Sequence, residues 1–337
     1  MSNYNQAKFI KQAVESVLSQ KTNFKFVLTI VDDNSTKDNS VEIIKDYANS
    51  YPDIIKPIFA KQNVGYLGNV LRASQDLNTK YFALLDADDY YTDENKLQKA
   101  FDFLESNPHY TIYSTNTLRV YDDGRRVPYI NTDIKEKDFT FDDYVADNAV
   151  LPCTPGLVFR NVIFSKGVPQ LLKDAIGTIS ERSFEGDGAR FPMHLYYGKA
   201  KFVNHIDGIY RVTNDGIWMR LSDFDRGVLI AKMFADLAKF FDAKYKIAFL
   251  AKSYIYAKEA LRTLKLKYDF ANPATAAFQQ SSFIVLHSVL SQTLEHKDEV
   301  NEYIKNNPIK KKINLKNKIR LMLFNKLEKS LQSKNLI

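Results

Sequence analysis

Three carboxylates directly follow an apolar run in the segment FALLDADDYYT, residues 82–92. They are Asp86, Asp88 and Asp89, and only Ala87 separates the first from the other two. Aspartate favours turns because its side chain can bond its own backbone, so a solvated turn at the end of a strand is one interpretation. The other is a metal site, because Mg²⁺ and Mn²⁺ prefer carboxylate oxygens and residues i and i+2 of a strand share a face.

A second acidic pair, Asp32 and Asp33, ends another apolar run, FKFVLTIV. Both pairs belong to a pattern in which short β-rich runs alternate with helical periodicity. The predicted strands are residues 24–31, 54–61 and 80–86, and the predicted helices are residues 7–20, 40–51, 66–78 and 93–108. This alternation indicates βαβ units and a mostly parallel central sheet. Ligands bind at the carboxyl ends of such strands, so the two acidic pairs could face one crevice.

The second half of the chain changes its pattern. Residues 111–130 predict a hairpin around Asp123–Gly124, and residues 151–160 predict a further strand. From about residue 222 onward, apolar residues recur three and four positions apart, which indicates helices. We therefore predict an α/β domain over residues 1–221, a helical region over 222–306 and a separate tail over 307–337.

Composition favours a soluble globular protein, since 45% of the 337 residues are hydrophobic and 26% are charged. The single cysteine, Cys153, excludes an intrachain disulfide, which fits a reducing compartment. The sequence shows no apolar run of about 18 residues and no signal peptide, so we expect a cytoplasmic protein.

The basic charge is concentrated at the end of the chain. Residues 305–337 carry +9, against +7 for the whole chain, so the first 304 residues carry −2. This distribution argues against a nucleic-acid-binding protein and predicts a local anionic partner. Apolar residues stand four apart among the lysines: Leu315, Ile319, Leu323, Leu327 and Leu331. Such a helix could lie peripherally on an anionic membrane, or dock its leucines on the preceding helices.

The order of the motifs resembles that of the inverting family 2 glycosyltransferases of bacterial surface-glycan type. The motifs are SNYNQAKFIKQAVESVLSQ, VDDNSTKDNS, NVGYLGN and LLDADDYYT, followed by EGDGARFPMHLYYGKAKFVNHIDGIYRVTNDGIW. The resemblance covers residues 3–220 and implies the nucleotide-sugar-binding GT-A fold. It also implies transfer of a sugar from a nucleotide-diphosphate donor, a UDP-sugar above all, to a glycan or lipid-linked acceptor in polysaccharide or lipooligosaccharide synthesis.

The resemblance assigns roles to the acidic turn. It implies that Asp88 binds a divalent metal, Mn²⁺ or Mg²⁺, and that Asp86 lies on the metal and on the ribose side of the donor. A bound divalent cation would stabilise the charge of the departing diphosphate. Asp89 could share this site or only cap the following segment.

The resemblance also implies donor contacts elsewhere. Asp32 and Asp33 match the motif whose aspartate bonds the nucleobase, and a carboxylate can accept the N–H of uracil. Asn63 and Gly65 match the loop beneath the donor. On the residues alone, the aspartates could instead form an Asx-turn, and Asn63 with Gly65 an ordinary turn.

The second half should supply a base for the acceptor hydroxyl. In the family this base is an aspartate before a helix, which Asp187 matches, with Glu185 as a weaker alternative. Asp187 could also be a plain helix N-cap. Arg211 matches the arginine of a Y-R pair and could bind phosphate. The histidine usual two residues later is Thr213 here, and Trp218 could line the acceptor side or simply pack.

One part of the family pattern is absent. The family begins with a buried strand before the turn matched by residues 2–5, yet only Met1 precedes this turn. Five or six buried aliphatic residues contribute about 1.5–3 kcal/mol each, comparable with a total stability of about 5–15 kcal/mol. We therefore expect the first strand to be missing and the chain to start at an internal methionine of a longer reading frame.

Two other functions remain open. A nucleotidyltransferase also places aspartates at strand ends, but it predicts a Gly-rich phosphate loop that the sequence does not show. A degenerate, non-catalytic nucleotide-sugar-binding protein would fit the missing strand and Thr213. The presence of Asp86, Asp88 and Asp187 together favours the enzyme.

Overall fold

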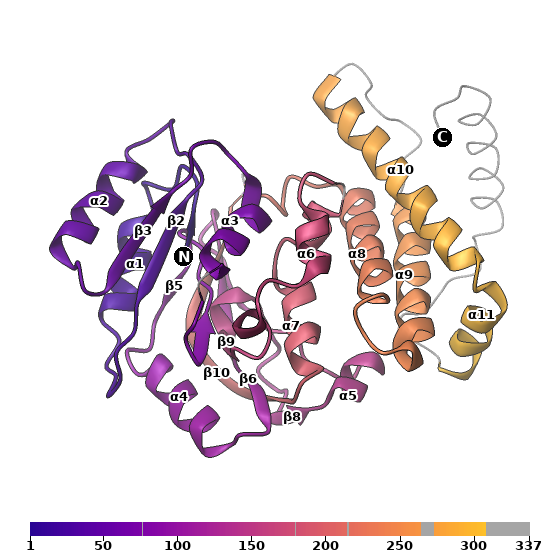
Figure 1. The fold of residues 1–337 in the computed structure, drawn as a ribbon, viewed down its shortest axis with the longest axis horizontal. Helices are drawn as coiled ribbons and strands as arrows, with labels where there is room; N and C mark the ends of the chain where they lie inside the picture. Colours follow the sequence, from indigo (N-terminus) through magenta and orange to yellow (C-terminus); the bar gives the residue numbers. More distant parts are fainter. Residues whose placement is uncertain (76, 179, 214–215, 264–272, 308–337) are drawn as a thin grey trace. The chain divides into compact units, whose positions relative to one another are not determined.

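The computed structural model describes residues 1–75, 77–178, 180–213, 216–263 and 273–307 (Figure 1). The chain divides into two compact units. The first comprises Met1–Tyr144 and Asn148–Asn214, and the second comprises Val145–Asp147 and Asp215–Ile337. The boundary that the sequence suggested, after residue 221, lies a few residues beyond this division.

The first unit begins with a three-stranded parallel sheet. Its strands are β1 (Ser2–Asn3), β2 (Leu28–Asp32) and β3 (Ile55–Phe59), in the order β1-β2-β3. The helices that follow them are α1 (Ile10–Leu18), α2 (Ser40–Ser50) and α3 (Gly65–Ser74). These parallel strands confirm the predicted βαβ pattern, because each strand is followed by a helix whose apolar side is buried. Ser2 of β1 also forms a parallel bridge to Asp86.

A seven-stranded mixed sheet completes the first unit. Its main order is β4 (Tyr81–Ala83), β9 (Leu157–Arg160), β6 (Tyr110–Tyr121), β10 (Lys199–Val212) and β5 (Tyr90–Tyr91). β7 (Arg126–Pro128) pairs with β6, and β8 (Lys137–Phe139) pairs with β10. Among the described residues, β6 and β10 are the only parallel pair of strands in this sheet. The mixed sheet is therefore less parallel than the sequence pattern suggested. The predicted hairpin is present as β6–β7, with Gly124 at φ +83°.

Two strands are shorter than predicted. The strand expected over residues 24–31 begins at Leu28, and Phe24 before it stacks on Phe101 with ring centroids 4.3 Å apart. Phe101 belongs to α4 (Lys96–Ser106). The strand expected over residues 80–86 is regular only over Tyr81–Ala83. The chain then turns toward β1, where Ser2 N donates to Leu85 O at 3.3 Å.

The rest of the first unit consists of short helices and turns. They are α5 (Phe141–Val145), α6 (Gln170–Ala175), α7 (Asp187–Leu195) and the 3₁₀ turns Thr154–Gly156, Phe164–Lys166 and Glu181–Phe184. Cys153 is buried, with Sγ 2.9 Å from Thr117 Oγ1.

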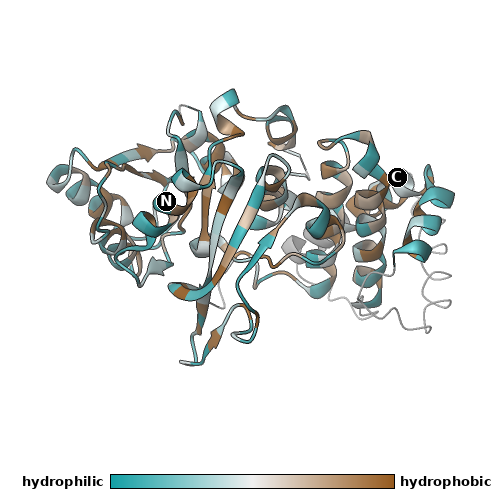
Figure 2. Ribbon diagram, turned by 90° about the horizontal axis from the view of Figure 1, so that it is seen from below, coloured by the Kyte–Doolittle hydropathy of each residue, from teal (hydrophilic) through white to brown (hydrophobic). Residues whose placement is uncertain are grey.

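The second unit is helical. Its helices in the described residues are α8 (Asp223–Leu237), α9 (Ala243–Thr263), α10 (Pro273–Leu294) and α11 (Lys297–Asn306). Ser222 caps α8 by accepting from Asp225 N at 3.1 Å. In Figure 2 these helices carry both hydrophobic and hydrophilic residues, as amphipathic helices do. None of the helices that the structure describes is long and apolar enough to cross a membrane. The predicted basic helix over 307–337 lies outside the described residues, apart from its first position.

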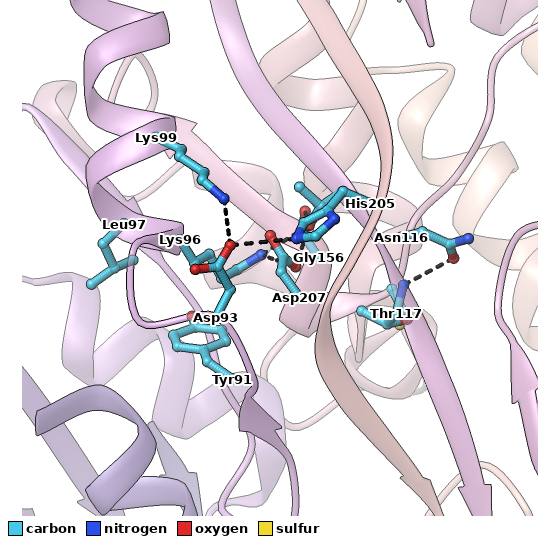
Figure 3. Close-up of polar contacts among 12 residues, drawn as sticks. Tyr91, Asp93, Lys96, Leu97, Lys99, Asn116, Thr117, Gly156, His205 and Asp207 are labelled. Atoms are coloured by element: carbon cyan, nitrogen blue, oxygen red, sulfur yellow. Dashed lines mark hydrogen bonds and ion pairs between the residues drawn. The ribbon is translucent and has the colours of Figure 1, made fainter. Parts of the chain in front are cut away.

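A buried ion pair fixes the strand that follows the acidic turn. Lys96 Nζ, on α4, donates to Asp207 Oδ1 at 2.7 Å and to Thr115 Oγ1 at 2.9 Å, and neither charged side chain is more than 2% exposed (Figure 3). Asp207 lies on β10, and its carbonyl accepts from Thr92 N at 2.9 Å. The ion pair therefore ties α4 to β10, and the backbone hydrogen bond from Thr92 ties the end of β5 to the same strand.

Candidate active site

The acidic turn is held in place by its backbone. Asp89 N donates to Asp86 O at 3.0 Å, which closes the turn, and Ala87 N donates to Ser2 O at 3.0 Å. The turn therefore lies at the carboxyl end of β4 and against β1. This is the edge of the sheet where parallel α/β proteins bind ligands.

The turn gathers carboxyl groups that disfavour one another's ionised forms. Burial, followed by repulsion from Asp88 and Asp187, raises the pKa of Asp86 to about 7. Arg190 opposes this rise but acts less strongly than either carboxylate. Burial also raises the pKa of Asp88, against the nearby charge of Arg211. Buried carboxylates that repel one another favour a bound cation, and such shifts are concentrated at functional sites.

Asp89 has a structural task in this turn. It is only 1% exposed, and its Oδ1 accepts the backbone N–H of Arg211 at 2.8 Å. Burial and the charges of Asp88 and Asp86 raise its pKa well above the ordinary value. Asp89 therefore fastens the acidic turn to β10.

Arg211 lies beside the turn. Its Nη1 donates to the carbonyl of Asp88, and its Nη2 donates to Gln12 Oε1 at 2.5 Å. The guanidinium also lies 4.7 Å from the ring centroids of Phe9 and Tyr90. These contacts hold a positive charge next to Asp88, where it could bind a phosphate group.

Asp187 reaches the same site from the other half of the unit. It is the first residue of α7, after Gly186 at φ +94°. Its Oδ1 accepts from Thr154 Oγ1 at 2.5 Å and from Arg190 Nη2 at 3.4 Å. Burial raises the pKa of the carboxyl, while Arg190 and Thr154 oppose the rise. Burial also raises the pKa of Glu185 to about 7, and Arg182, 4.0 Å away, lowers it in part.

The carboxylate of Asp32 accepts hydrogen bonds from other residues of the chain. It accepts from Asn3 Nδ2 at 2.7 Å, from Ser35 N at 2.9 Å and from Ser35 Oγ at 2.6 Å. The side chain is 1% exposed. Asp32 thus joins the end of β1 to the loop after β2, and its contact to a nucleobase stays a prediction.

Asp33 holds the predicted donor loop. Its Oδ1 accepts from Val64 N at 2.7 Å, and its Oδ2 accepts from Gly65 N at 3.0 Å. Gly65 begins α3 with φ +76°, a conformation that side chains rarely adopt. Asn63 is exposed, with Nδ2 3.5 Å from Asp33 O. The loop and the aspartate are therefore neighbours, and their contacts to a donor stay predictions.

The structure adds three residues that the sequence reasoning did not select: Arg190, Tyr66 and Thr154. Arg190 Nη2 lies 3.2 Å from Tyr66 Oη as well as 3.4 Å from Asp187 Oδ1. One signal was available for Arg190, because residues three apart on a helix lie on the same side, and Arg190 follows Asp187 by three. Tyr66 and Thr154 come from distant segments and had no such signal.

The donor set fits a hard divalent cation. Asp86 and Asp88 offer carboxylate oxygens in a buried acidic environment, which Mg²⁺ and Mn²⁺ prefer. The residues that the structure describes contain no group of three or more His, Cys, Asp or Glu side chains placed to hold a metal ion. A cation here would thus take one or two protein carboxylates, with phosphate and water as its other ligands.

The chain is similar to known proteins in both sequence and fold. Residues 1–166 match the family model described as glycosyl transferase family 2. An uncharacterized protein of Mycobacterium tuberculosis is 28% identical over 215 residues, which cover 64% of this chain and 58% of that protein. A protein of Shigella flexneri named dTDP-rhamnosyl transferase RfbG is 32% identical over 158 residues, covering 46% of this chain and 52% of that protein. The chain thus spans little more than half the length of these relatives.

The fold has a counterpart among solved structures. The crystal structure of Staphylococcus aureus TarS, residues 1–349, matches with a TM-score of 0.54 at 17% identity, and the match covers 90% of each chain. At that identity the match concerns the fold, and it confirms the predicted α/β fold with helices after it. Residues 1–166, which include the acidic turn, therefore match glycosyl transferase family 2.

Proposed function

We propose that this chain transfers a sugar, with inversion, from a nucleotide-diphosphate donor to a hydroxyl of a glycan or lipid-linked acceptor. The pathway would be synthesis of a cell-surface polysaccharide or lipooligosaccharide. The match of residues 1–166 to family 2 and the similarity to a rhamnosyl transferase support this proposal. The observation that carries it is the joint acidic site, in which the Asp86 carboxyl is repelled both by Asp88 and by Asp187, although Asp187 lies about a hundred residues later in the sequence.

The donor end of the site would be formed by the acidic turn and its neighbours. Asp88 and Asp86 would hold a divalent ion, Mn²⁺ or Mg²⁺, which when bound supplies charge stabilisation for the leaving diphosphate. Arg211 would bind a phosphate oxygen. Asp32, Asp33, Asn63 and Gly65 would lie on the nucleotide side, where a carboxylate can accept the imide N–H that uracil and thymine share. UDP-sugars and dTDP-sugars are therefore both candidate donors.

The acceptor end would depend on Asp187. Its carboxylate would accept the proton of the acceptor hydroxyl while the hydroxyl oxygen forms a bond to the anomeric carbon. The bond from that carbon to the diphosphate oxygen breaks on the opposite face, so the anomeric configuration inverts. Thr154, which donates to Asp187 Oδ1, would hold the carboxylate in one orientation.

A donor screen tests the proposal. The full chain is incubated with UDP- and dTDP-sugars and with Mn²⁺, Mg²⁺ or EDTA, and release of the nucleoside diphosphate is measured. We expect release from one donor that needs the divalent ion, and a loss of at least about 100-fold in Asp88→Asn, because several kcal/mol of charge stabilisation disappear. Asp123→Asn, an exposed aspartate in the β6–β7 turn, is the matched control. If no donor is bound or consumed with any divalent ion, the proposal is wrong.

We further propose peripheral contact with the cytoplasmic face of the membrane. The charge of +9 over residues 305–337 supports this placement, since anionic lipids attract clustered lysines. Sedimentation of the full chain with phosphatidylserine vesicles tests it, with a chain ending at residue 306 as the comparison. Equal sedimentation of the two would contradict the contact.

A further inference from the structure

Arg190 is a buried cation between two elements of the candidate site. It lies on α7, one turn after Asp187, and is 4% exposed. Its Nη2 is 3.4 Å from Asp187 Oδ1 and 3.2 Å from Tyr66 Oη, and Tyr66 belongs to α3. The guanidinium carbon also lies 5.7 Å from the centre of the Tyr66 ring. One nitrogen of Arg190 thus connects the candidate base with a second helix.

These contacts do not use every hydrogen-bond donor of Arg190. Its Nε is buried and has no hydrogen-bond partner. Leaving a buried donor unpaired costs the full desolvation penalty of that group. A guanidinium is expected to be buried despite this cost where its charge has a function. The charged group that Arg190 contacts is the Asp187 carboxylate.

Asp187 is otherwise in acidic and apolar surroundings. The titratable groups that interact with it come from every neighbouring element: Asp86 from the acidic turn, Tyr66 from α3, Cys153 before the Thr154–Gly156 turn, and Tyr129 after β7. Each of these groups is neutral or negative. Arg190 is therefore the positive group that favours the ionised form of Asp187.

We propose that Arg190 is a positioning residue for the base. Its guanidinium, anchored on the Tyr66 hydroxyl, holds the Asp187 carboxylate in one place and keeps it ionised, ready to accept a proton. This role rests on the proposed function, because it assigns Arg190 a part in the step that Asp187 would perform. A purely structural role would instead tie α7 to α3 and leave the protonation of Asp187 unchanged.

Carbon-13 NMR separates the two roles without any turnover. The protein is labelled at the aspartate carboxyl carbons, and the Asp187 signal is the one that disappears in Asp187→Asn. In Arg190→Gln we expect the pKa of Asp187 to rise by about one to two units, because an opposite charge at this distance lowers a carboxyl pKa by about one to three. Arg125→Gln, which removes an exposed arginine of the β6–β7 turn, should leave the signal unchanged. An unchanged Asp187 pKa in Arg190→Gln overturns the proposal.

Kinetics give the second readout. The acid limb of the kcat profile should move to higher pH by the same one to two units in Arg190→Gln, with KM for the donor nearly unchanged. Arg190→Lys keeps the charge but lacks the planar fork, so it should keep the acid limb within about half a unit and lower kcat about fivefold or more. If Arg190→Gln does not fold, Arg190→Lys decides, and wild-type kcat in that variant overturns the proposal. Absence of turnover in the wild type would refute the proposed function alone, because the NMR titration still tests the role of Arg190.

Discussion

At the scale of single residues, the candidate site departs from the rule that buried charges are paired. Asp86 illustrates the cost. Its folded-state pKa of about 7 lies above the ordinary 3.8, so the folded protein keeps a proton that the unfolded chain has already released at neutral pH. The stabilising effect of that proton is full below about pH 4 and is lost as the pH rises through 7. Ionisation of Asp86 therefore weakens the fold as the pH rises through 7.

This sign leads to a stability prediction for Asp86→Asn. An amide cannot ionise, so at pH 8 in EDTA the variant should be more stable than the wild type, by up to about 4 kcal/mol for a shift of this size. At pH 4 the two should be nearly equal. Thermal unfolding at both pH values measures the difference, with Asp123→Asn as an exposed control. A lower melting temperature for Asp86→Asn at pH 8 would contradict the assignment of buried, repelling carboxylates.

The base makes a separate prediction. Asp187→Asn keeps the size of the side chain and can still bond Thr154, but it cannot accept a proton at neutral pH. Turnover should fall by about 10² to 10⁴, the usual range for general base catalysis, while the donor Kd changes less than about threefold. Initial rates and calorimetric titration of the donor measure the two quantities. Near wild-type turnover would move the role of base to another group, and Glu185→Gln would then be the next variant.

Sequence reasoning selected the acidic residues at this scale but could not see their partners. Asp33 was chosen for a nucleobase, yet both of its oxygens accept backbone N–H groups of Val64 and Gly65. Backbone donors leave no mark in the sequence, so such a use of a carboxylate is invisible until the fold is known. Arg190 was missed for a related reason, because its importance comes from burial against Tyr66, a contact across 124 residues of sequence.

At the scale of elements, local patterns were reliable and long-range pairing was not. The helices α1, α2 and α4 lie where apolar periodicity placed them; β3 lies within its predicted run, and β2 ends one residue beyond its own. The fourteen-residue strand β10 was not predicted, because its polar residues interrupt the apolar alternation. Its neighbours in the sheet, β6 and β5, lie about a hundred residues earlier in the sequence. Such a pairing depends on contacts that no short window of sequence contains.

Variants of the buried Lys96–Asp207 pair test whether this ion pair joins β10 and α4. Removing one partner leaves a buried unpaired charge, so Lys96→Met or Asp207→Asn should each destabilise the first unit by about 3–5 kcal/mol. The double variant Lys96→Met/Asp207→Asn should be less destabilised than the sum of the two. Denaturant unfolding followed by a double-mutant cycle measures this coupling.

A matched control lies one turn away on α4. Lys99 pairs with Asp93 at 2.6 Å, but Lys99 is 51% exposed, so Lys99→Met should cost less than about 1 kcal/mol. Figure 3 shows both pairs side by side. Additive effects of the Lys96 and Asp207 variants would mean that the pair does not hold the two elements together.

At the scale of the whole molecule, the family match and the folded unit have different extents. The family model ends at residue 166, whereas the first unit continues to residue 214. The residues beyond 166 supply Asp187 at the start of α7 and Arg211 on β10. They also supply the strand that lies between β6 and β5 in the mixed sheet. Both the fold and the candidate chemistry therefore need the segment that follows the family match.

Truncation tests this dependence. A fragment of residues 1–166 lacks β10, so it would expose the long edge of β6 and leave β5 without its partner. Unpaired edges of this kind promote aggregation, and the fragment should be insoluble or should unfold without a cooperative transition. A fragment of residues 1–213 retains β10 and α7 and should unfold cooperatively in circular dichroism. A monomeric, cooperatively unfolding fragment 1–166 would show instead that the parallel sheet and its helices suffice for folding, and that β10 serves only to bring Arg211 to the acidic turn.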